Sequence, residues 1–370
     1  MTDSRQGRKI RVAVLFGGQS DEHDVSIRSV QTVMKAIDSD RYEVVPIGIT
    51  RGGSWIVDGD PIAALVHASK ALSEDQVDGP DEAAGAVAQV SPVTGALAIA
   101  GSETAPIDVV FPVLHGPFGE DGSVQGLLEI AGVPYVGSGV LGSAVAMDKA
   151  IAKHVLAAAG IPQLPWLMLT RRDVRDRAEQ VADRIEGTIG FPCFTKPANL
   201  GSSVGISRVG SRAELMPALN EAAFYDRRIV VEKGVDAREI EMSVLGNDEP
   251  VASVAGEVIP RGEFYDYNAK YIDDTTDLVI PAKLDVSLLA FLQELAVDAF
   301  RALDLAGLAR VDFFVERGTG QVYLNEVNTM PGFTSISMYP MLWEASGVPI
   351  SDLVSRLIDL AIERHDERKR

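Results

Sequence analysis

Two short segments near the C-terminus carry oxygen-bearing side chains that could hold a divalent cation. The segments are ARVDFFV and QVYLNEVN, with a glycine-containing turn between them. Side chains alternate along a strand, so Asp312 shares a face with Arg310, and Glu326 shares one with Asn328. With the strands side by side, Asp312, Glu326 and Asn328 can converge. Two carboxylates and an amide oxygen suit magnesium bound together with substrate phosphates. The same pattern also fits a solvated polar face on which Arg310 pairs with an acid.

A second group of residues has the properties of a phosphate site. Lys196 ends an apolar strand and precedes PANLGSSVG, a loop of small residues whose backbone amides can surround phosphate oxygens. Lys149 and Lys270 offer two more cations, and an extended run passes through Glu232. Any one of these lysines alone would usually be a solvated surface residue. Together with the metal candidates, the set predicts a nucleoside triphosphate held between two sheets.

Two other motifs match well-known signatures but lack the required context. GSGVLG, residues 137–142, matches the dinucleotide fingerprint, but no acid follows at about twenty residues. A tight strand-to-helix entry at a domain junction explains it better. GSSVG, residues 201–205, matches the nucleophile elbow, but a β-like segment follows where a helix is needed. A serine hydrolase built on Ser203 therefore stays as an alternative of another class.

Composition and charge narrow the class of protein. The chain has 370 residues, enough for two or three domains. Its net charge of -19 argues against nucleic-acid partners, whereas small anionic substrates need only a local basic pocket. The single cysteine, Cys193, cannot form an internal disulfide, which favours a cytoplasmic location. No segment reads as a membrane span, so we expect no membrane partner.

The succession of strands and helices predicts an α/β fold. Residues 9–50 follow a strand–helix–strand order, typical of an open, mostly parallel sheet that binds ligands at the carboxyl ends of its strands. The acidic stretch at 58–105 reads as a peripheral insertion. The expected domains are 1–141, 142–231 and 232–370.

Seven motifs, taken in order, resemble the ATP-grasp superfamily and in detail the D-alanine–D-alanine ligase family, over nearly the whole chain. They are LFGGQSDEHDVS, HGPFGEDGSVQG, KPANLGSSVGISRV, VEKGVDAREIE, EFYDYNAKY, RVDFF and NEVNTMPGFTSIS. The resemblance implies a three-domain ATP-grasp ligase, in which an N-terminal open parallel sheet is followed by two α+β units that clamp ATP. It does not cover the acidic insertion well.

The resemblance also implies ligands for the nucleotide and the metal. The implied ATP-binding residues are Lys149, Lys196, Ser202, Ser203, Glu232, Lys233, Val235, Glu239, Phe264, Lys270 and Glu326. Asp312, Glu326 and Asn328 match the family's ligands for two magnesium ions, for which manganese can substitute. Potassium activation and a homodimer are expected by family analogy.

On the acceptor side, the implied catalytic residues are Glu22, Ser202, Tyr271, Arg310, Gly332 and Ser337. Glu22 would fix the ammonium of the first D-alanine, with His115 near its carboxylate. For Glu22 the alternative is an acid that complements a helix dipole. Arg310 and the Gly332 N–H would hold the oxyanion, and Ser337 the second carboxylate. Ser202 and Tyr271 would join Glu22 in a hydrogen-bonded bridge.

The implied reaction proceeds in two steps. The first D-alanine's carboxylate attacks the γ-phosphate, and the second D-alanine's amine attacks the resulting acyl phosphate, releasing ADP and phosphate and giving a dipeptide for peptidoglycan. Residues 262–274 would be the lid that excludes water. Tyr271 favours an amine acceptor. Another ATP-grasp ligase, or a regulatory protein whose metal site does no chemistry, remains open as an alternative.

Overall fold

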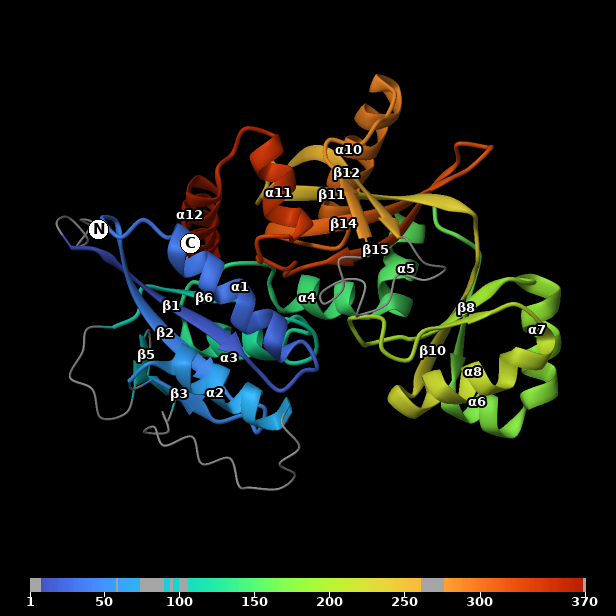
Figure 1. Ribbon diagram of the computed structural model, residues 1–370, viewed down its shortest axis with the longest axis horizontal. Coiled ribbons are helices and arrows are strands. Elements are labelled where there is room, and N and C mark those ends of the chain that lie inside the picture. The colour runs from blue at the N-terminus through green and yellow to red at the C-terminus, as the bar shows by residue number, and fades with distance from the viewer. Residues whose placement is uncertain are drawn as a thin grey trace.

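The computed structural model describes residues 8–57, 59–73, 90–93, 96–99, 106–260 and 276–368. Its elements are arranged as three bodies around a middle region that contains helices α4 and α5 (Figure 1). The predicted lid, with Phe264, Lys270 and Tyr271, lies outside the described residues. So does most of the acidic stretch, within which α2 (Pro61–Ser73) and the hairpin of β4 (Val90–Val93) and β5 (Ala96–Ile99) are described.

The N-terminal body contains the predicted open and mostly parallel sheet. Its strands, in spatial order, are β3 (Trp55–Ile56), β2 (Tyr42–Ile49), β1 (Ile10–Gly17) and β6 (Val109–Pro112). β1 pairs in parallel with β2 and β6, and only β3 is antiparallel to its neighbour. Residues of β1 alternate between two cores, Val14 in one and Leu15 in the other, so both faces of the sheet are buried.

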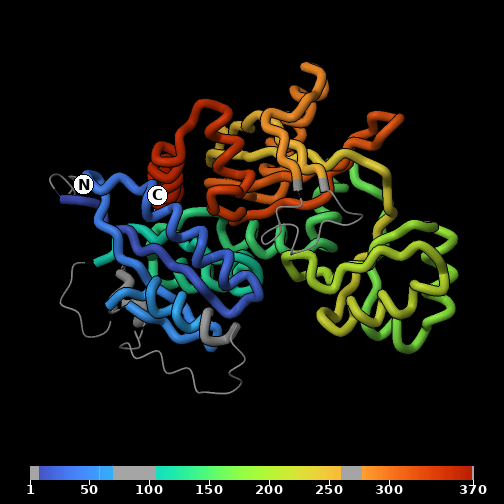
Figure 2. The backbone as a smooth tube through the Cα atoms, in the orientation of Figure 1, coloured from blue at the N-terminus to red at the C-terminus, as the bar shows by residue number. Residues whose placement is uncertain are grey.

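Helices cover both faces of this sheet. α1 (His23–Ala36) and the C-terminal α12 (Ile350–Arg368) contribute to the core on one face, and α3 (Ser123–Ala131) to the core on the other. The first described strand, β1, and the last helix, α12, consequently belong to one body (Figure 2). The last helix thus ties the end of the chain to the first sheet.

The central body has a four-stranded antiparallel sheet. Its strands, in spatial order, are β7 (Trp166–Thr170), β10 (Arg228–Lys233), β8 (Cys193–Pro197) and β9 (Ser207–Val209). Helices α7 (Ala178–Thr188) and α8 (Arg212–Tyr225) complete its core, in which Cys193 is fully buried. Burial raises the pKa of the Cys193 thiol to about 11, so this cysteine is an unreactive packing residue.

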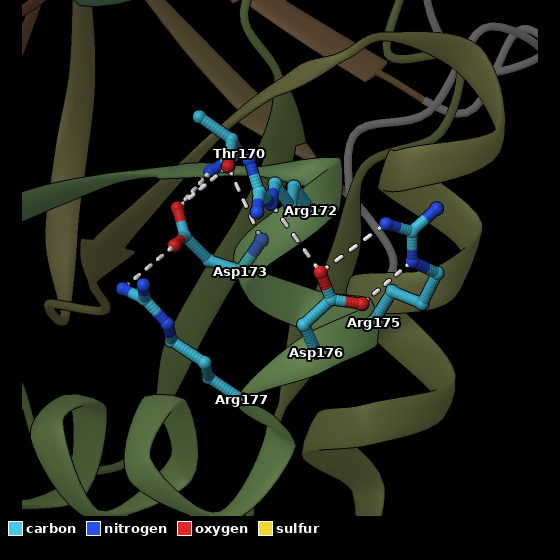
Figure 3. A network of polar contacts seen from close by, with 6 residues as sticks. All are labelled: Thr170, Arg172, Asp173, Arg175, Asp176 and Arg177. Carbon is cyan, nitrogen blue, oxygen red and sulfur yellow. Dashed lines mark hydrogen bonds and ion pairs between the residues drawn. The ribbon is translucent and has the colours of Figure 1, made fainter.

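The charged segment that follows β7 forms two helices rather than one. The Thr170 hydroxyl accepts from the Asp173 N–H (3.2 Å), and the Asp173 carboxylate accepts from the Thr170 N–H (3.0 Å), a capping box that begins α6 (Arg171–Asp176) (Figure 3). Arg177 leaves helical geometry and ends α6, while its guanidinium lies 3.6 Å from Asp173. This local hydrogen bonding divides the helix, which hydrophobic periodicity does not reveal.

The C-terminal body has a five-stranded antiparallel sheet. Its strands, in spatial order, are β13 (Thr276–Val279), β12 (Val251–Pro260), β11 (Ala237–Gly246), β14 (Gly307–Glu316) and β15 (Val322–Asn328). Helix α10 (Val286–Ala302) packs into the core on one face, and α11 (Met338–Ala345) lies against β11 and β12. The predicted hairpin is therefore the edge of a larger sheet.

The hydrophobic cores do not follow the linear order of the chain. α4 (Val140–Met147) and α5 (Lys149–Ala158) precede the central sheet in sequence, yet Ala146 and Leu156 belong to the core of the C-terminal sheet. The division at residues 141 and 231 therefore stays a prediction.

The glycines of GSGVLG explain why this fingerprint is misleading. A side chain at Gly142 would collide with the backbone of Asp304, and one at Gly307 would lie 3.3 Å from the Gly137 nitrogen. These glycines permit close backbone packing between α4 and the C-terminal body. The expected tight entry into a helix is present, but it follows an isolated β-bridge at Tyr135 rather than a strand, and the domain junction stays a prediction.

Candidate active site

A cleft of about 570 Å³ lies where the three bodies meet. Its walls include Glu22 and His115 from the N-terminal body, Lys196 from the central sheet, and Arg310 and Glu326 from the C-terminal sheet. Residues more than 300 positions apart in the sequence thus face one space, for which we distinguish an acceptor end around Glu22 and a nucleotide end around Glu232.

The β14–β15 hairpin has the pairing that the sequence predicted. Arg310 lies opposite Asn328, and Asp312 lies opposite Glu326. The Asn328 amide donates to Asp312 (3.1 Å), and Glu326 and Asn328 line the cleft while Asp312 lies directly behind them. The three candidate metal ligands therefore lie at one place on the sheet.

Arg310 forms an ion pair with an acid, as expected if the hairpin were only a solvated polar face. Its guanidinium donates to both oxygens of Asp312 (2.8 Å each) and lies 3.0 Å from Glu241. A carboxylate oxygen has more than one lone pair, so Asp312 can accept from Arg310 and still bind a cation. The ion pair and the metal site are thus compatible, and Arg310 is held facing the cleft.

A strand irregularity next to this site adds a residue that the sequence did not reveal. The register shifts after Asp312, because Phe313 pairs with Leu324 and leaves Asn325 as an extra residue. Such a bulge re-aims side chains. Asn325 lines the cleft, where its side-chain oxygen lies 3.4 Å from Lys196 Nζ.

Three charged side chains form a buried group at the nucleotide end. Glu232 on β10 is 1% exposed, and its carboxylate is paired with Lys153 through one oxygen and with Lys196 through the other (2.7 Å). Burial disfavours charge on Glu232, but the two lysines outweigh this and lower its pKa to about 2. Glu232 also raises the pKa of Lys196 against the effect of burial. Glu232 thus favours the charged form of Lys196, whereas burial lowers the pKa of Lys153 despite its pairing with Glu232.

Lys153 was missed by the sequence interpretation, although a signal exists. It lies four residues after Lys149 on α5, the spacing that places two side chains on one face of a helix. Asp148 separates α4 from α5 and caps α5 by accepting from the Ile151 N–H (3.0 Å). The break makes Lys149 the first residue of α5, and its Nζ donates to the Leu200 carbonyl (2.6 Å).

The glycine-rich loop at 201–205 adopts an unusual backbone conformation. Ser202 and Ser203 have φ values of 49° and 61°, in the left-handed region that non-glycine residues rarely occupy. No strand-to-helix elbow is formed, since β9 follows the loop. A hydrolase nucleophile at Ser203 therefore lacks its required structural context, while both serines face the cleft.

At the acceptor end, Glu22 reaches across to this loop. It is the N-cap of α1, but its side chain makes no capping bond and instead accepts from the Ser202 hydroxyl. Side chains at Gly116 and Gly201 would approach a Glu22 oxygen to 2.7 and 2.8 Å. Glycine at both positions lets two loops close around this buried carboxylate.

His115 is held as a neutral imidazole. Its Nδ1 lies 2.9 Å from the Met330 carbonyl and must donate to it, and its Nε2 lies 3.1 Å from the Ser29 hydroxyl. Burial lowers the pKa of His115, partly opposed by Glu22. His115 lines the cleft as predicted, but both ring nitrogens are already used within the protein.

The remaining predicted residues have different positions. The cleft is lined by Lys233, at the end of β10, and by Val235 and Glu239, which follow it in the chain. Gly332 also lines the cleft. Ser337 lies behind Gly332, where a side chain would meet the Ser337 oxygen at 2.7 Å. The Ser337 hydroxyl accepts from the Thr334 N–H (2.9 Å).

The oxygen donors at the hairpin fit magnesium. Within the described ranges, no cluster of three or more His, Cys, Asp or Glu side chains could hold a metal ion. Asp312, Glu326 and Asn328 supply two carboxylates and an amide instead. A hard cation that keeps waters and binds substrate phosphates needs only such a partial protein shell.

Family comparisons match almost the entire chain. The family described as "D-ala D-ala ligase N-terminus" matches residues 11–138, and "D-ala D-ala ligase C-terminus" matches residues 155–359. The chain belongs to the D-alanine–D-alanine ligase family. Two relatives called D-alanine–D-alanine ligase, from Heliobacterium modesticaldum and Geobacillus kaustophilus, are each 50% identical. Each alignment covers 98% of this chain and 97% of the relative.

Solved structures place the fold in the same family. The D-alanine–D-alanine ligase from Coxiella burnetii is 38% identical, with a TM-score of 0.82, and the match covers 98% of this chain and 96% of that one. VanG D-Ala:D-Ser ligase from Enterococcus faecalis is 33% identical, also at 0.82, over 96% of this chain and 100% of that one. The predicted α/β ATP-grasp architecture is thereby confirmed. Among the helices that the structure describes, none has both the length and the apolar character needed to span a lipid bilayer.

The sequence analysis missed one further acidic residue that lines the cleft. Glu120 lines the cleft, and its carboxylate accepts from the Gly116 N–H and the Met330 N–H, both at 2.8 Å. Burial and the neighbouring Glu22 raise the pKa of Glu120 to about 8. Glu120 lies within HGPFGEDG, directly before Asp121, which is a residue type common in turns. Nothing in this motif indicates that the Glu120 side chain contacts Met330, in a distant part of the chain.

Proposed function

We propose that this protein joins two D-alanines in an ATP-dependent reaction, through a D-alanyl phosphate, to give D-alanyl-D-alanine for peptidoglycan precursors. The observation that carries the proposal is one cleft whose walls include the acid Glu22, the lysine-bound Glu232, and both Arg310 and Glu326. Such a cleft suits a small ammonium-bearing substrate and a polyphosphate brought together for in-line transfer.

At the nucleotide end, Lys149 and Lys196 would contact phosphates, and the backbone from Glu232 to Val235 would meet the adenine, with Glu239 at the ribose. Asp312, Glu326 and Asn328 would hold magnesium, which supplies charge neutralisation for the phosphate oxygens. The left-handed loop at 201–205 would cover the γ-phosphate with Ser202 and Ser203. Phe264 and Lys270 complete the proposed nucleotide contacts.

At the acceptor end, Glu22 would bind the ammonium of the first D-alanine, whose carboxylate attacks the γ-phosphate. The neutral amine of the second D-alanine then attacks the acyl carbon, and phosphate leaves as the tetrahedral intermediate collapses. Arg310 and the Gly332 N–H would stabilise the developing oxyanion. Ser337 would bind the second carboxylate, and Tyr271 would join the Glu22–Ser202 pair.

His115 takes a narrower role than the family resemblance implied. Because both of its ring nitrogens are engaged, we assign it to shaping the pocket for the first carboxylate rather than to pairing with it as a cation. Use of ATP fits a cytoplasmic location. A homodimer, substitution of manganese for magnesium, and activation by potassium belong to the proposal on family analogy alone.

The test is release of ADP from ATP and magnesium with a panel of acceptors. We expect turnover with D-alanine, one dipeptide formed per ADP, and little turnover with L-alanine or D-lactate. Equal rates with L-alanine, or none with either enantiomer, would discard the proposal. D-Serine is included because the solved D-Ala:D-Ser ligase has the same fold, and a mixed dipeptide as main product would reassign the second substrate.

A further inference from the structure

The loop that follows β15 is held by the N-terminal body at three points. The Met330 N–H donates to Glu120 (2.8 Å), the Met330 carbonyl accepts from His115 (2.9 Å), and the Phe333 N–H donates to the Ser29 hydroxyl (3.1 Å). These contacts join residues more than 200 positions apart. The loop geometry is thus determined by side chains from another body.

The hydrogen-bond donors and acceptors of Ser29, His115 and the 330–333 loop can all be satisfied at the same time. The Ser29 hydroxyl accepts from Phe333 and can therefore donate its own hydrogen to His115 Nε2, which leaves Nδ1 of His115 protonated for the Met330 carbonyl. Glu120 uses its second oxygen for the Gly116 N–H, in the loop that closes on Glu22. A single carboxylate therefore connects the Glu22 pocket to the loop at 330–333.

Between the two anchored residues lies Gly332, which lines the cleft. Within the described residues, no hydrogen-bond partner is found for its N–H. A side chain here would lie 2.7 Å from the Ser337 oxygen, so the backbone is closely fitted on its other side. The direction of the Gly332 N–H therefore depends on how Met330 and Phe333 are held.

We propose that Glu120 is a positioning residue that fixes the 330–333 loop so that the Gly332 N–H points at the reacting carbonyl. The inference rests on the proposed function and deepens it. A misdirected oxyanion donor loses most of its effect, because such donors act through fixed geometry. Glu120 is therefore needed when the amine attacks, and not for binding ATP at the far end of the cleft.

The energetics of Glu120 support a functional role. Its carboxyl is buried and faces Glu22, which together raise its pKa to about 8, while its two backbone partners and Arg310 act in the opposite direction. Among the described residues its hydrogen-bond partners are two neutral backbone N–H groups, so holding this shielded acid is a cost to the fold. Groups of this kind concentrate at functional sites.

The test compares Glu120→Gln with Asp121→Asn. Glutamine can accept only one of the two N–H groups, because its amide nitrogen faces the other. Asp121 is the matched control: its carboxylate also accepts two backbone N–H groups, from Phe118 (2.9 Å) and Ser123 (3.0 Å), but both lie within its own loop. We expect kcat for dipeptide formation to fall at least tenfold in Glu120→Gln and to stay within twofold in Asp121→Asn. The KM for ATP should change by less than twofold in both.

A second measurement separates the two chemical steps. Hydroxylamine competes with the second D-alanine for the acyl phosphate and traps it as a hydroxamate, so the trapping is measured at D-alanine concentrations too low to fill the second site. We expect hydroxamate formation by Glu120→Gln to be reduced much less than dipeptide formation. Equal losses in the two assays, an unchanged kcat, or the same loss in Asp121→Asn would each overturn the inference. Wild-type protein without activity toward D-alanine would instead overturn the proposed function.

A variant on the other anchor keeps the inference testable if Glu120→Gln does not fold. Ser29→Ala removes the acceptor for Phe333 but leaves Glu120 in place. It should also lower kcat, by about threefold or more, without affecting the KM for ATP. The double variant should lose less than the product of the two single effects, since both act on one loop. An unchanged kcat in Ser29→Ala would contradict the inference.

Discussion

The two ends of the cleft each contain a glutamate shielded from water, and the two carboxyl groups differ sharply in acidity. At the nucleotide end, the pKa of Glu232 is lowered to about 2. At the acceptor end, the pKa of Glu120 is raised to about 8. Glu232 is fully buried and Glu120 is half-buried, and burial by itself would raise both pKa values.

The difference arises from the partners of each carboxylate. Glu232 lies between the ammonium groups of Lys153 and Lys196, whereas Glu120 accepts from two neutral backbone N–H groups and faces the negative Glu22. Burial disfavours the charged form of both carboxyl groups, and nearby cations determine whether this effect is offset. In the proposed function, the first end would bind a polyanion, while acids at the other end would orient loops and an ammonium.

The largest effect is expected from removing the shared acid at the nucleotide end. Glu232→Gln leaves Lys153 and Lys196 without the acid that they share and with only the more weakly acting Glu326 in common, which should lower the free energy of unfolding by about 3–5 kcal/mol. Denaturant titration at neutral pH measures this. The double variant Glu232→Gln, Lys153→Met should recover part of the loss, because one uncompensated charge is removed as well. A single-variant loss below about 1 kcal/mol would mean that the pairs in this cluster are weakly coupled.

Removing one lysine should separate catalysis from stability at the same end. In Lys196→Met, Glu232 keeps Lys153, so the fold should tolerate the change better than Glu232→Gln. The cation facing the phosphates is lost, and kcat/KM for ATP should fall by about 10²–10³-fold, as for other positioned charge stabilisers. Steady-state kinetics with varied ATP gives the value. The exposed Lys35 is the control, since Lys35→Met should leave kinetics and stability unchanged. A loss below tenfold would exclude Lys196 from phosphate binding.

The sequence allowed much of the nucleotide end to be predicted. Strand alternation placed Asp312, Glu326 and Asn328 together because all three lie on one hairpin, where local rules determine which side chains are neighbours. Lys196 was recognisable as a strand-end residue before a glycine loop. Lys153 was overlooked because its spacing from Lys149 places both on one helix face but does not show that this face meets Glu232 on β10.

The acceptor end was harder to predict, because its contacts join separate bodies. Glu120 and Met330 are 210 residues apart, and Glu22 and Ser202 are 180 apart. No local periodicity encodes such pairs, so Glu22 and Ser202 entered only through the family resemblance. The bulge at Asn325 shows the same limit within a hairpin, since one extra residue changes which side chain faces Lys196.

The raised pKa of Glu120 predicts a pH dependence of stability opposite to that of an ion-paired acid. Between its ordinary value of 4.5 and about 8, the folded protein keeps a proton that the unfolded chain releases. The free energy of unfolding should therefore fall as pH rises through this window. Glu120→Gln removes the titration, so the variant should gain about 2 kcal/mol relative to wild type between pH 5 and pH 8, at about 1.4 kcal/mol per pKa unit with an allowance for relaxation. Denaturant midpoints at both pH values measure this.

Two further groups, His115 and Glu232, also contribute to the pH dependence of stability, and their contributions must be distinguished from that of Glu120. His115 has a lowered pKa, so its contribution to stability is lost as pH falls below 6.5. Glu232 has a lowered pKa, so its contribution is lost only as pH falls from 4.5 toward 2. Both effects are common to wild type and Glu120→Gln, and they cancel in the difference. Parallel pH profiles for the two proteins would show that Glu120 is ionised normally.

The smallest effect is expected from the bond that links the acceptor end to the nucleotide loop. Ser202→Ala removes the hydroxyl that donates to Glu22 and leaves that carboxylate free to turn. The KM for the first D-alanine should rise about tenfold, the equivalent of roughly 1.4 kcal/mol, while stability changes little. Ser207→Ala is the matched control, because Ser207 donates to Glu221 (2.6 Å) in an equivalent serine–glutamate bond on the exposed surface of the central body. If both variants behave like wild type, Glu22 is oriented by the packing of Gly116 and Gly201 alone, and the acceptor end does not depend on the nucleotide loop.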